Sequence, residues 1–152
     1  MEDTLHTGDR LIVNRLPVTW DHIRGNSYVP ERGQVIVFKN PRYISGHIDE
    51  YIVKRVIAFP GERVVVKDGV MKVYNAEFVT GMEVDKLYPG ALQPTDGAVD
   101  MVVPDGEIFV AGDHRQPGYS FDSRNGLGTI PYEDIVGPVL VRLYPFTQLK
   151  VF

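Results

Sequence analysis

A lysine stands in the middle of an otherwise apolar run. Lys54 occurs within Tyr51-Ile52-Val53-Lys54-Arg55-Val56-Ile57, most of whose members favour a buried β-strand. Such a lysine either extends its ammonium group from a strand edge to water or is held in an apolar pocket. In a pocket, burial lowers the pKa of the amine from about 10.4, and the neutral amine can then act as a base. The spacing alone leaves both interpretations open.

A second group of polar residues follows a predicted strand at residues 107–111. It consists of Gly112-Asp113-His114-Arg115 and, further on, Ser120-Phe121-Asp122-Ser123-Arg124-Asn125-Gly126. One interpretation is a polar loop held by an ion pair between Asp122 and Arg124. A catalytic triad of His114, Asp113 and Ser120 is the alternative, although the side chains of adjacent residues seldom converge on one point.

The composition gives little support to thiol or metal chemistry. The chain has no cysteine, which removes disulfides, zinc–thiolate sites and cysteine nucleophiles. Because His6, His22 and His47 share no metal-ligand spacing, we expect no metal site, and nothing else in the sequence indicates a cofactor. Serine is scarce too, so a serine hydrolase has few places for its nucleophile; the serines are Ser27, Ser45, Ser120 and Ser123.

Length and charge exclude several classes of protein. The 152 residues are 43% hydrophobic and 24% charged, as in a soluble globular domain. The net charge is −4, and no run of basic residues exceeds two, so we expect no nucleic-acid partner. No apolar stretch reaches the roughly 18 residues that a membrane-spanning helix needs. We expect a monomer.

Glycine and proline interrupt short β-branched runs along the chain, which predicts an all-β fold. Asp68-Gly69 predicts a two-residue hairpin turn between Lys67 and Val70. No segment keeps a helical apolar period, and residues 131–134 can begin at most one short helical turn. The predicted strands are residues 10–15, 34–39, 51–58, 63–67, 70–74, 107–111 and 135–144.

Two stretches are predicted to be connections. Residues 17–32 are too irregular for a strand. Residues 75–105 are rich in Gly, Pro and Asp and predict an insert between two better-patterned halves. We therefore expect a single domain over residues 1–152 with an inserted cap at roughly 68–106.

In order and spacing, several segments together resemble bacterial type I signal peptidase, the membrane-anchored Ser/Lys protease that removes secretory signal peptides. The resemblance covers nearly the whole chain except the predicted insert. The segments are Met1-Glu2-Asp3-Thr4-Leu5, Arg32-Gly33-Gln34-Val35-Ile36-Val37-Phe38, Lys54-Arg55-Val56-Ile57-Ala58-Phe59-Pro60-Gly61-Glu62 and Gly112-Asp113 through Ser120-x-Asp122-Ser123-Arg124-x-Gly126.

The resemblance implies a signal-peptidase-like β-barrel or sandwich and a role for each matching residue. Lys54 would be the general base, oriented by Ser120, and Asp122 and Arg124 would brace their loop together with Gly112 and Asp113. The enzyme would cut preproteins after small residues of the Ala-x-Ala type. The substrate would contact Met1, Leu5, Tyr51, Ile52 and Val53.

The resemblance places the nucleophilic serine just before Met1, outside this chain, so we expect the chain as written to be inactive. It is either a fragment or a homologue that has lost its serine and binds secreted proteins without cutting them. A repressor-type Ser/Lys autoprotease and a plain β-barrel binding module are further alternatives. The sequence departs from the family pattern at two positions. Asp3 stands in place of proline, and its negative charge would favour a protonated Lys54. His114 stands in place of asparagine.

The resemblance also implies where the protein works. Its partners would be secretory preproteins and a membrane surface, with the catalytic domain on the extracytoplasmic face of the cell membrane. Trp20 and Tyr28, in the irregular stretch, could contact the lipid interface, where aromatic rings are favourable.

Overall fold

The computed structural model of the chain describes residues 1, 4–45, 49–88, 91, 94–145 and 149–152. Its larger sheet has seven strands in the order β1-β10-β2-β3-β8-β9, with β11 paired to β10. All recorded pairings in this sheet are antiparallel. The strands are β1 (Arg10–Val13), β2 (Val35–Lys39), β3 (Tyr51–Ala58), β8 (Glu107–Ala111), β9 (Ile130–Pro131), β10 (Ile135–Tyr144) and β11 (Lys150–Val151).

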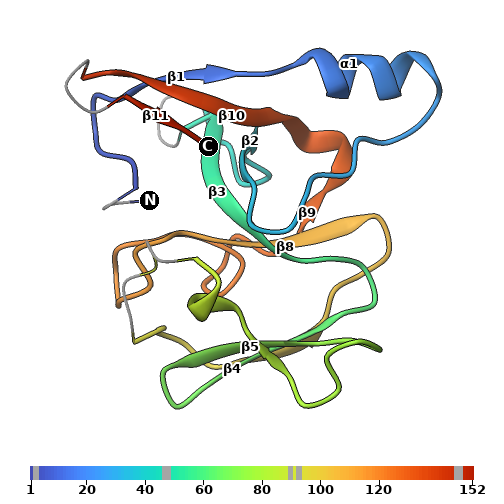
Figure 1. Ribbon diagram of the computed structural model, residues 1–152, viewed down its shortest axis with the longest axis vertical. Coiled ribbons are helices and arrows are strands. Elements are labelled where there is room, and N and C mark those ends of the chain that lie inside the picture. Colours follow the sequence, from blue (N-terminus) through green and yellow to red (C-terminus); the bar gives the residue numbers. More distant parts are fainter. Residues whose placement is uncertain (2–3, 46–48, 89–90, 92–93, 146–148) are drawn as a thin grey trace.

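The smaller sheet has four strands in the order β6-β5-β4-β7 and lies below the larger one in Figure 1. The predicted hairpin is confirmed, since Lys67 pairs with Val70 and both turn residues have positive φ, 52° at Asp68 and 79° at Gly69. The strands are β4 (Arg63–Lys67), β5 (Val70–Tyr74), β6 (Met82–Glu83) and β7 (Val99–Val102), and the short 3-10 helix η1 (Val84–Lys86) follows β6. The predicted insert, residues 68–106, thus contains β5, β6, η1 and β7. We call the four strands and η1, with the segment that joins η1 to β7, the cap.

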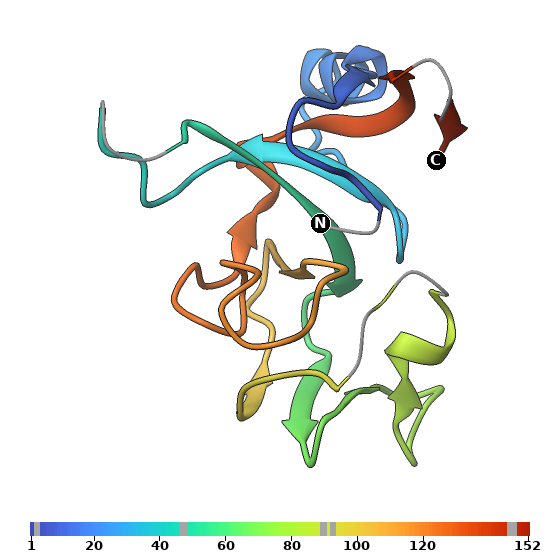
Figure 2. The same cartoon turned by 90° about the vertical axis from the view of Figure 1, so that its left-hand side faces the viewer.

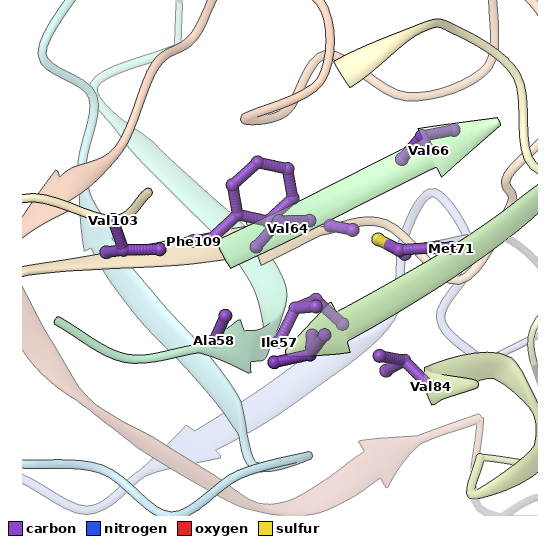
Figure 3. Packing of buried hydrophobic residues seen from close by; sticks show 10 residues of the cluster. Ile57, Ala58, Val64, Val66, Met71, Val84, Val103 and Phe109 are labelled. Carbon is purple, nitrogen blue, oxygen red and sulfur yellow. The ribbon is translucent and has the colours of Figure 1, made fainter. Parts of the chain in front are cut away.

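The all-β prediction is confirmed, and along the described strands neither sheet closes on itself. An apolar cluster joins the two sheets, because the ends of β3 and β8 pack against the inner face of the cap (Figure 3). The cluster consists of Ile57, Ala58, Val64, Val66, Met71, Val73, Val84, Val103, Phe109 and Ala111. The cap is therefore packed against the same strand that carries Lys54.

The prediction that no segment forms a helix is wrong, and the stretch predicted to be an irregular connection, residues 17–32, begins with helical residues. Helix α1 (Leu16–Ile23) lies beside β10, as Figure 2 shows. None of its residues is buried, so it has no core-facing apolar stripe for the sequence to reveal. Its start is marked instead by Pro17 and by the side chain of Asn14, which accepts a hydrogen bond from the Leu16 N–H (3.1 Å).

The short helical turn expected at residues 131–134 is present as the 3-10 helix η2 (Tyr132–Asp134). Over the described ranges, no helix has the length and apolar character needed to cross a bilayer.

Candidate active site

Lys54 lies in the middle of β3, opposite Ile36 of β2, with only 8% of its surface exposed. Within the part of the chain that the structure describes, its amine forms no hydrogen bond or ion pair. Burial lowers the pKa of Lys54 below its ordinary value. The charges of Asp122 and Asp113 oppose this shift, whereas the charge of Arg124 adds to it. Of the two interpretations of Lys54, the pocket is therefore the one observed.

A groove of about 400 Å³ opens beside the amine. Its lining includes Lys54 together with every residue that the resemblance implied for substrate contact, namely Met1, Leu5, Tyr51, Ile52 and Val53. His6, Thr7, Asp9, Leu11 and Asp49 complete it. Leu5 and Val53 belong to an apolar cluster with β2 and β10, which gives the groove a firm apolar floor. The structure thus brings the predicted base and the predicted substrate residues to one place.

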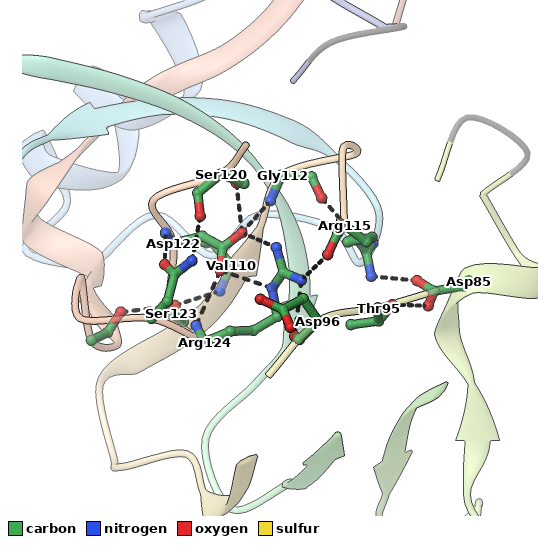
Figure 4. A network of polar contacts seen from close by, with 12 residues as sticks. Asp85, Thr95, Asp96, Val110, Gly112, Arg115, Ser120, Asp122, Ser123 and Arg124 are labelled. Carbon is green, nitrogen blue, oxygen red and sulfur yellow. Dashed lines mark hydrogen bonds and ion pairs between the residues drawn. The ribbon is translucent and has the colours of Figure 1, made fainter. Parts of the chain in front are cut away.

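The loop after β8 is organised around Asp122, whose side chain is fully buried (Figure 4). Its carboxylate accepts hydrogen bonds from the Gly112 N–H (2.9 Å), the Ser120 hydroxyl (2.7 Å) and two nitrogens of Arg124 (2.9 and 2.8 Å). Burial alone would raise the pKa of Asp122, but the hydrogen bonds and charge of Arg124, aided by Gly112 and Ser120, lower it overall. The predicted ion pair between Asp122 and Arg124 is present.

Ser120 lies in this loop with its hydroxyl directed at Asp122. The structure shows no hydrogen bond between Ser120 and Lys54, which the resemblance implied, over the described residues. Gly112 makes the position of Ser120 possible, because a Cβ at Gly112 would lie 2.1 Å from the Ser120 Oγ. With its hydrogen donated to Asp122, the Ser120 oxygen can still accept a hydrogen bond, from a neutral amine as well as from an ammonium group.

Asp113 ties three segments together. Its carboxylate receives two hydrogen bonds from Arg55, at 2.8 and 2.6 Å, and one from the hydroxyl of Thr4. Arg55 also donates to the carbonyl oxygen of Gly33 (2.7 Å). Burial raises the pKa of Asp113, but its hydrogen bonds and the charge of Arg55 lower it overall. Thr4 and Arg55 were not predicted as site residues. The only available signal was their place in the matching segments.

The triad of His114, Asp113 and Ser120 is not formed. The acceptor of the Ser120 hydroxyl is Asp122, and the carboxylate of Asp113 is taken by Arg55 and Thr4. The His114 ring instead stacks on Tyr119, with 3.9 Å between ring centroids. Asp3 and His47 lie outside the described residues.

Comparison with known proteins now identifies the family. The model of the family described as signal peptidase, peptidase S26, matches residues 1–144. The chain belongs to this signal peptidase family. The resemblance seen in the sequence is thereby confirmed.

Signal peptidases that resemble the chain come from different bacteria. It is 32% identical to a probable signal peptidase I-1 of Synechocystis sp., over 97% of this chain and 68% of that protein. It is 31% identical to signal peptidase I of Bacillus amyloliquefaciens, over 99% and 74%. A crystal structure of a signal peptidase I from Enterococcus faecalis shares the fold, with a TM-score of 0.51, 24% identity, and coverage of 74% of this chain and 98% of that chain. The family supports a peptidase that removes signal peptides.

Proposed function

We propose that this chain carries the catalytic lysine of a signal peptidase, with Lys54 as the general base of a Ser/Lys dyad. The observation that carries the proposal is a buried lysine with a lowered pKa in the wall of a groove that apolar side chains and polar side chains line together. A neutral amine can take a proton from a serine hydroxyl without help from histidine. No metal or cofactor takes part in this proposal.

The nucleophile of the proposed reaction is a serine placed just before Met1, as the family spacing implies. Met1 lines the same groove as Lys54, so a residue joined to it would start near the amine. The serine oxygen attacks the scissile carbonyl while Lys54 takes its proton. The resulting ammonium, whose N–H the Ser120 oxygen can accept, gives the proton to the amine that leaves as the C–N bond breaks. Water, deprotonated in turn by the neutral Lys54, then attacks the serine ester and releases the acyl product and the serine hydroxyl. Backbone N–H groups would stabilise the oxyanion.

The free edge of β3 supports an extended substrate. β2 pairs with β3 from Tyr51 to Arg55, but on the opposite side β8 pairs only from Arg55 onward. Over the described strands, residues 51–54 therefore have one open edge, beside the groove. A peptide can add there as a further strand. Leu5 and Val53 offer apolar contacts there to small side chains of the Ala-x-Ala type, which the resemblance implies.

The proposal is tested by extending the chain before Met1 with a serine and a short upstream segment. The extended protein should cleave a signal-peptide substrate with an Ala-x-Ala site. Cleavage should be lost with Lys54→Met and with alanine in place of the added serine. No cleavage by a folded extended protein would contradict the proposal and would favour a homologue that binds secreted proteins without cutting them.

We also propose that the protein works at a membrane surface, on its extracytoplasmic side. One edge of the molecule, formed by α1, β1, β10 and β11 along the top of Figure 1, carries large apolar side chains exposed to solvent. We call this set the apolar edge: Ile12, Leu16, Trp20, Ile23, Leu140, Leu143, Tyr144 and Val151. Side chains of this kind are favourable at a lipid interface.

Trp20, with Arg24 stacked 4.6 Å from its ring, has the amphipathic character of an interfacial anchor. Tyr28 packs instead against the core and donates to Gln34 (3.0 Å), so it does not belong to this surface. Serine at Leu16, Trp20 and Ile23 should abolish binding to vesicles that contain anionic lipid. Unchanged binding would contradict the proposal.

A further inference from the structure

The cap reaches the loop of Asp122 through a buried ion pair. Arg115, which is fully buried, donates through Nε to the carbonyl oxygen of Gly112 and through Nη1 to the carboxylate of Asp85 in η1. The other oxygen of Asp85 accepts a hydrogen bond from the Thr95 hydroxyl (2.7 Å). Figure 4 shows this chain of contacts running from Asp85 to the base of the loop.

Backbone contacts join the same two segments. The carbonyl oxygen of Arg115 accepts from the Asp96 N–H (2.9 Å) and from Nη1 of Arg124 (2.8 Å). Thr95 is itself held by the hairpin of the cap, since its N–H donates to the carbonyl oxygen of Gly69 (2.9 Å). The cap and the loop are therefore fastened at several adjacent points.

A separate contact leads from the cap to Asp113. The ring of Tyr88, two residues beyond η1, lies 5.3 Å from the guanidinium of Arg55, which holds Asp113. A Cβ at Gly33 would lie only 2.2 Å from the Tyr88 ring, so the two pack closely. Both carboxylates that act on Lys54 are thus supported from the cap.

Arg115 depends on Asp85 for its charge balance. Of its nitrogens, Nη2 has no hydrogen-bond partner among the described residues. Its guanidinium already interacts electrostatically with Asp113 and Asp122. Without Asp85, Arg115 would lose its ion pair while it stays buried, which is a costly arrangement because Asp113 and Asp122 are already paired with Arg55 and Arg124.

We propose that Asp85 is a positioning residue for Lys54, which seats the loop of Asp122 through Arg115 and so keeps water away from the amine. The inference rests on the proposed role of Lys54 as the base. When Asp85 is lost, Arg115 loses its ion-pair partner in the cap, the loop loosens and water reaches the amine. Asp85 does not act on Lys54 directly; the charges that do are Asp122, Arg124 and Asp113.

The test is a pH titration of Lys54 in the chain without the added serine. The titration is monitored through the NMR signals of the Cε and Nζ atoms of Lys54. The Lys54 signal is assigned with Lys54→Met. Because the largest cause of the lowered pKa is burial, Asp85→Asn should shift the midpoint of Lys54 upward, toward its ordinary value. His6, Asp9 and Asp49 line the groove beside Lys54 and stay unchanged in this comparison.

The matched control is Glu83→Gln, which removes a carboxylate two residues away that pairs with the exposed Lys86 (2.7 Å). It should leave the midpoint where it is. An unchanged midpoint in folded Asp85→Asn would overturn the inference. If Asp85→Asn does not fold, Thr95→Val carries the test, with a smaller upward shift expected and no shift overturning the inference.

The same experiment separates the two proposals. An ordinary midpoint for Lys54 in the unsubstituted chain would contradict the proposed function, and the inference would fail with it. A lowered midpoint that is the same with and without Asp85→Asn would contradict the inference alone.

Discussion

Two regions of this molecule reverse the usual distribution of polar and apolar groups. Around Lys54, charged side chains are buried, with Asp113, Arg115 and Asp122 fully so. At the apolar edge, large hydrophobic side chains are exposed, among them Leu16 at 79% and Ile23 at 74%. Asp113, Arg115 and Asp122 form ion pairs with Arg55, Asp85 and Arg124, whereas large apolar side chains of the edge are exposed to solvent. The first region is therefore held by internal ion pairs, and we propose that the second contacts a membrane surface.

The largest effect should come from breaking the buried pair of Asp122 and Arg124. Arg124→Met leaves a buried carboxylate without its cation, which costs about 3–5 kcal/mol of the free energy of unfolding. Urea denaturation measures this loss. The matched control is Arg63→Met, which removes an exposed pair with Asp100 (2.6 Å) and should cost much less than the buried pair, because water screens its charges. Equal losses would show that burial does not distinguish the two pairs.

A smaller loss is expected for Gly112→Ala, because the added methyl group would collide with Ser120. Overpacking of this kind costs about 1–3 kcal/mol, again measured by urea denaturation. In a Ser120→Gly background the same substitution should cost less, since the colliding side chain is gone. Equal losses in both backgrounds would contradict the contact.

Lys54→Met should stabilise the folded chain at neutral pH, because it removes a buried amine whose pKa is lowered by desolvation, and it also removes the proposed base. Between the lowered pKa of the folded state and the ordinary value near 10.4, the unfolded chain binds one more proton than the folded chain. The contribution of Lys54 to the free energy of unfolding therefore rises with pH. Stability curves of both proteins should converge as the pH approaches 10. A constant difference would contradict a lowered pKa.

The smallest effect on stability belongs to the apolar edge. Trp20→Ser should change the free energy of unfolding by no more than about 0.5 kcal/mol, because the side chain is 57% exposed. Its binding to vesicles, measured by flotation, should nevertheless fall. A large loss of stability together with unchanged vesicle binding would show that Trp20 stabilises the fold and does not contact the membrane.

Local signals predicted much of this fold. The β-branched runs and the Asp68-Gly69 turn predicted strands and a hairpin, because backbone preference acts over a few residues. Helix α1 escaped prediction because Leu16, Trp20 and Ile23 are exposed and only Val18 packs against the core, so the sequence shows no buried stripe. The pair of Asp122 and Arg124 was predictable, since the two residues are close in sequence.

Partners distant in sequence were not predictable in the same way. Arg55 pairs with Asp113, which is fifty-eight positions away in the sequence, and Arg115 pairs with Asp85, which is thirty positions away. Which carboxylate meets which arginine depends on how the cap packs against β3 and β8, and no local pattern records it. The resemblance supplied the place of Lys54 in the site, and the structure supplied its surroundings.

The central claim is that Lys54 acts as a neutral base, and the pH dependence of cleavage by the serine-extended chain tests it most directly. The rate constant should rise with pH through a single ionisation whose midpoint equals that of Lys54 measured by NMR in the same protein. A rate that follows a different midpoint would contradict the claim.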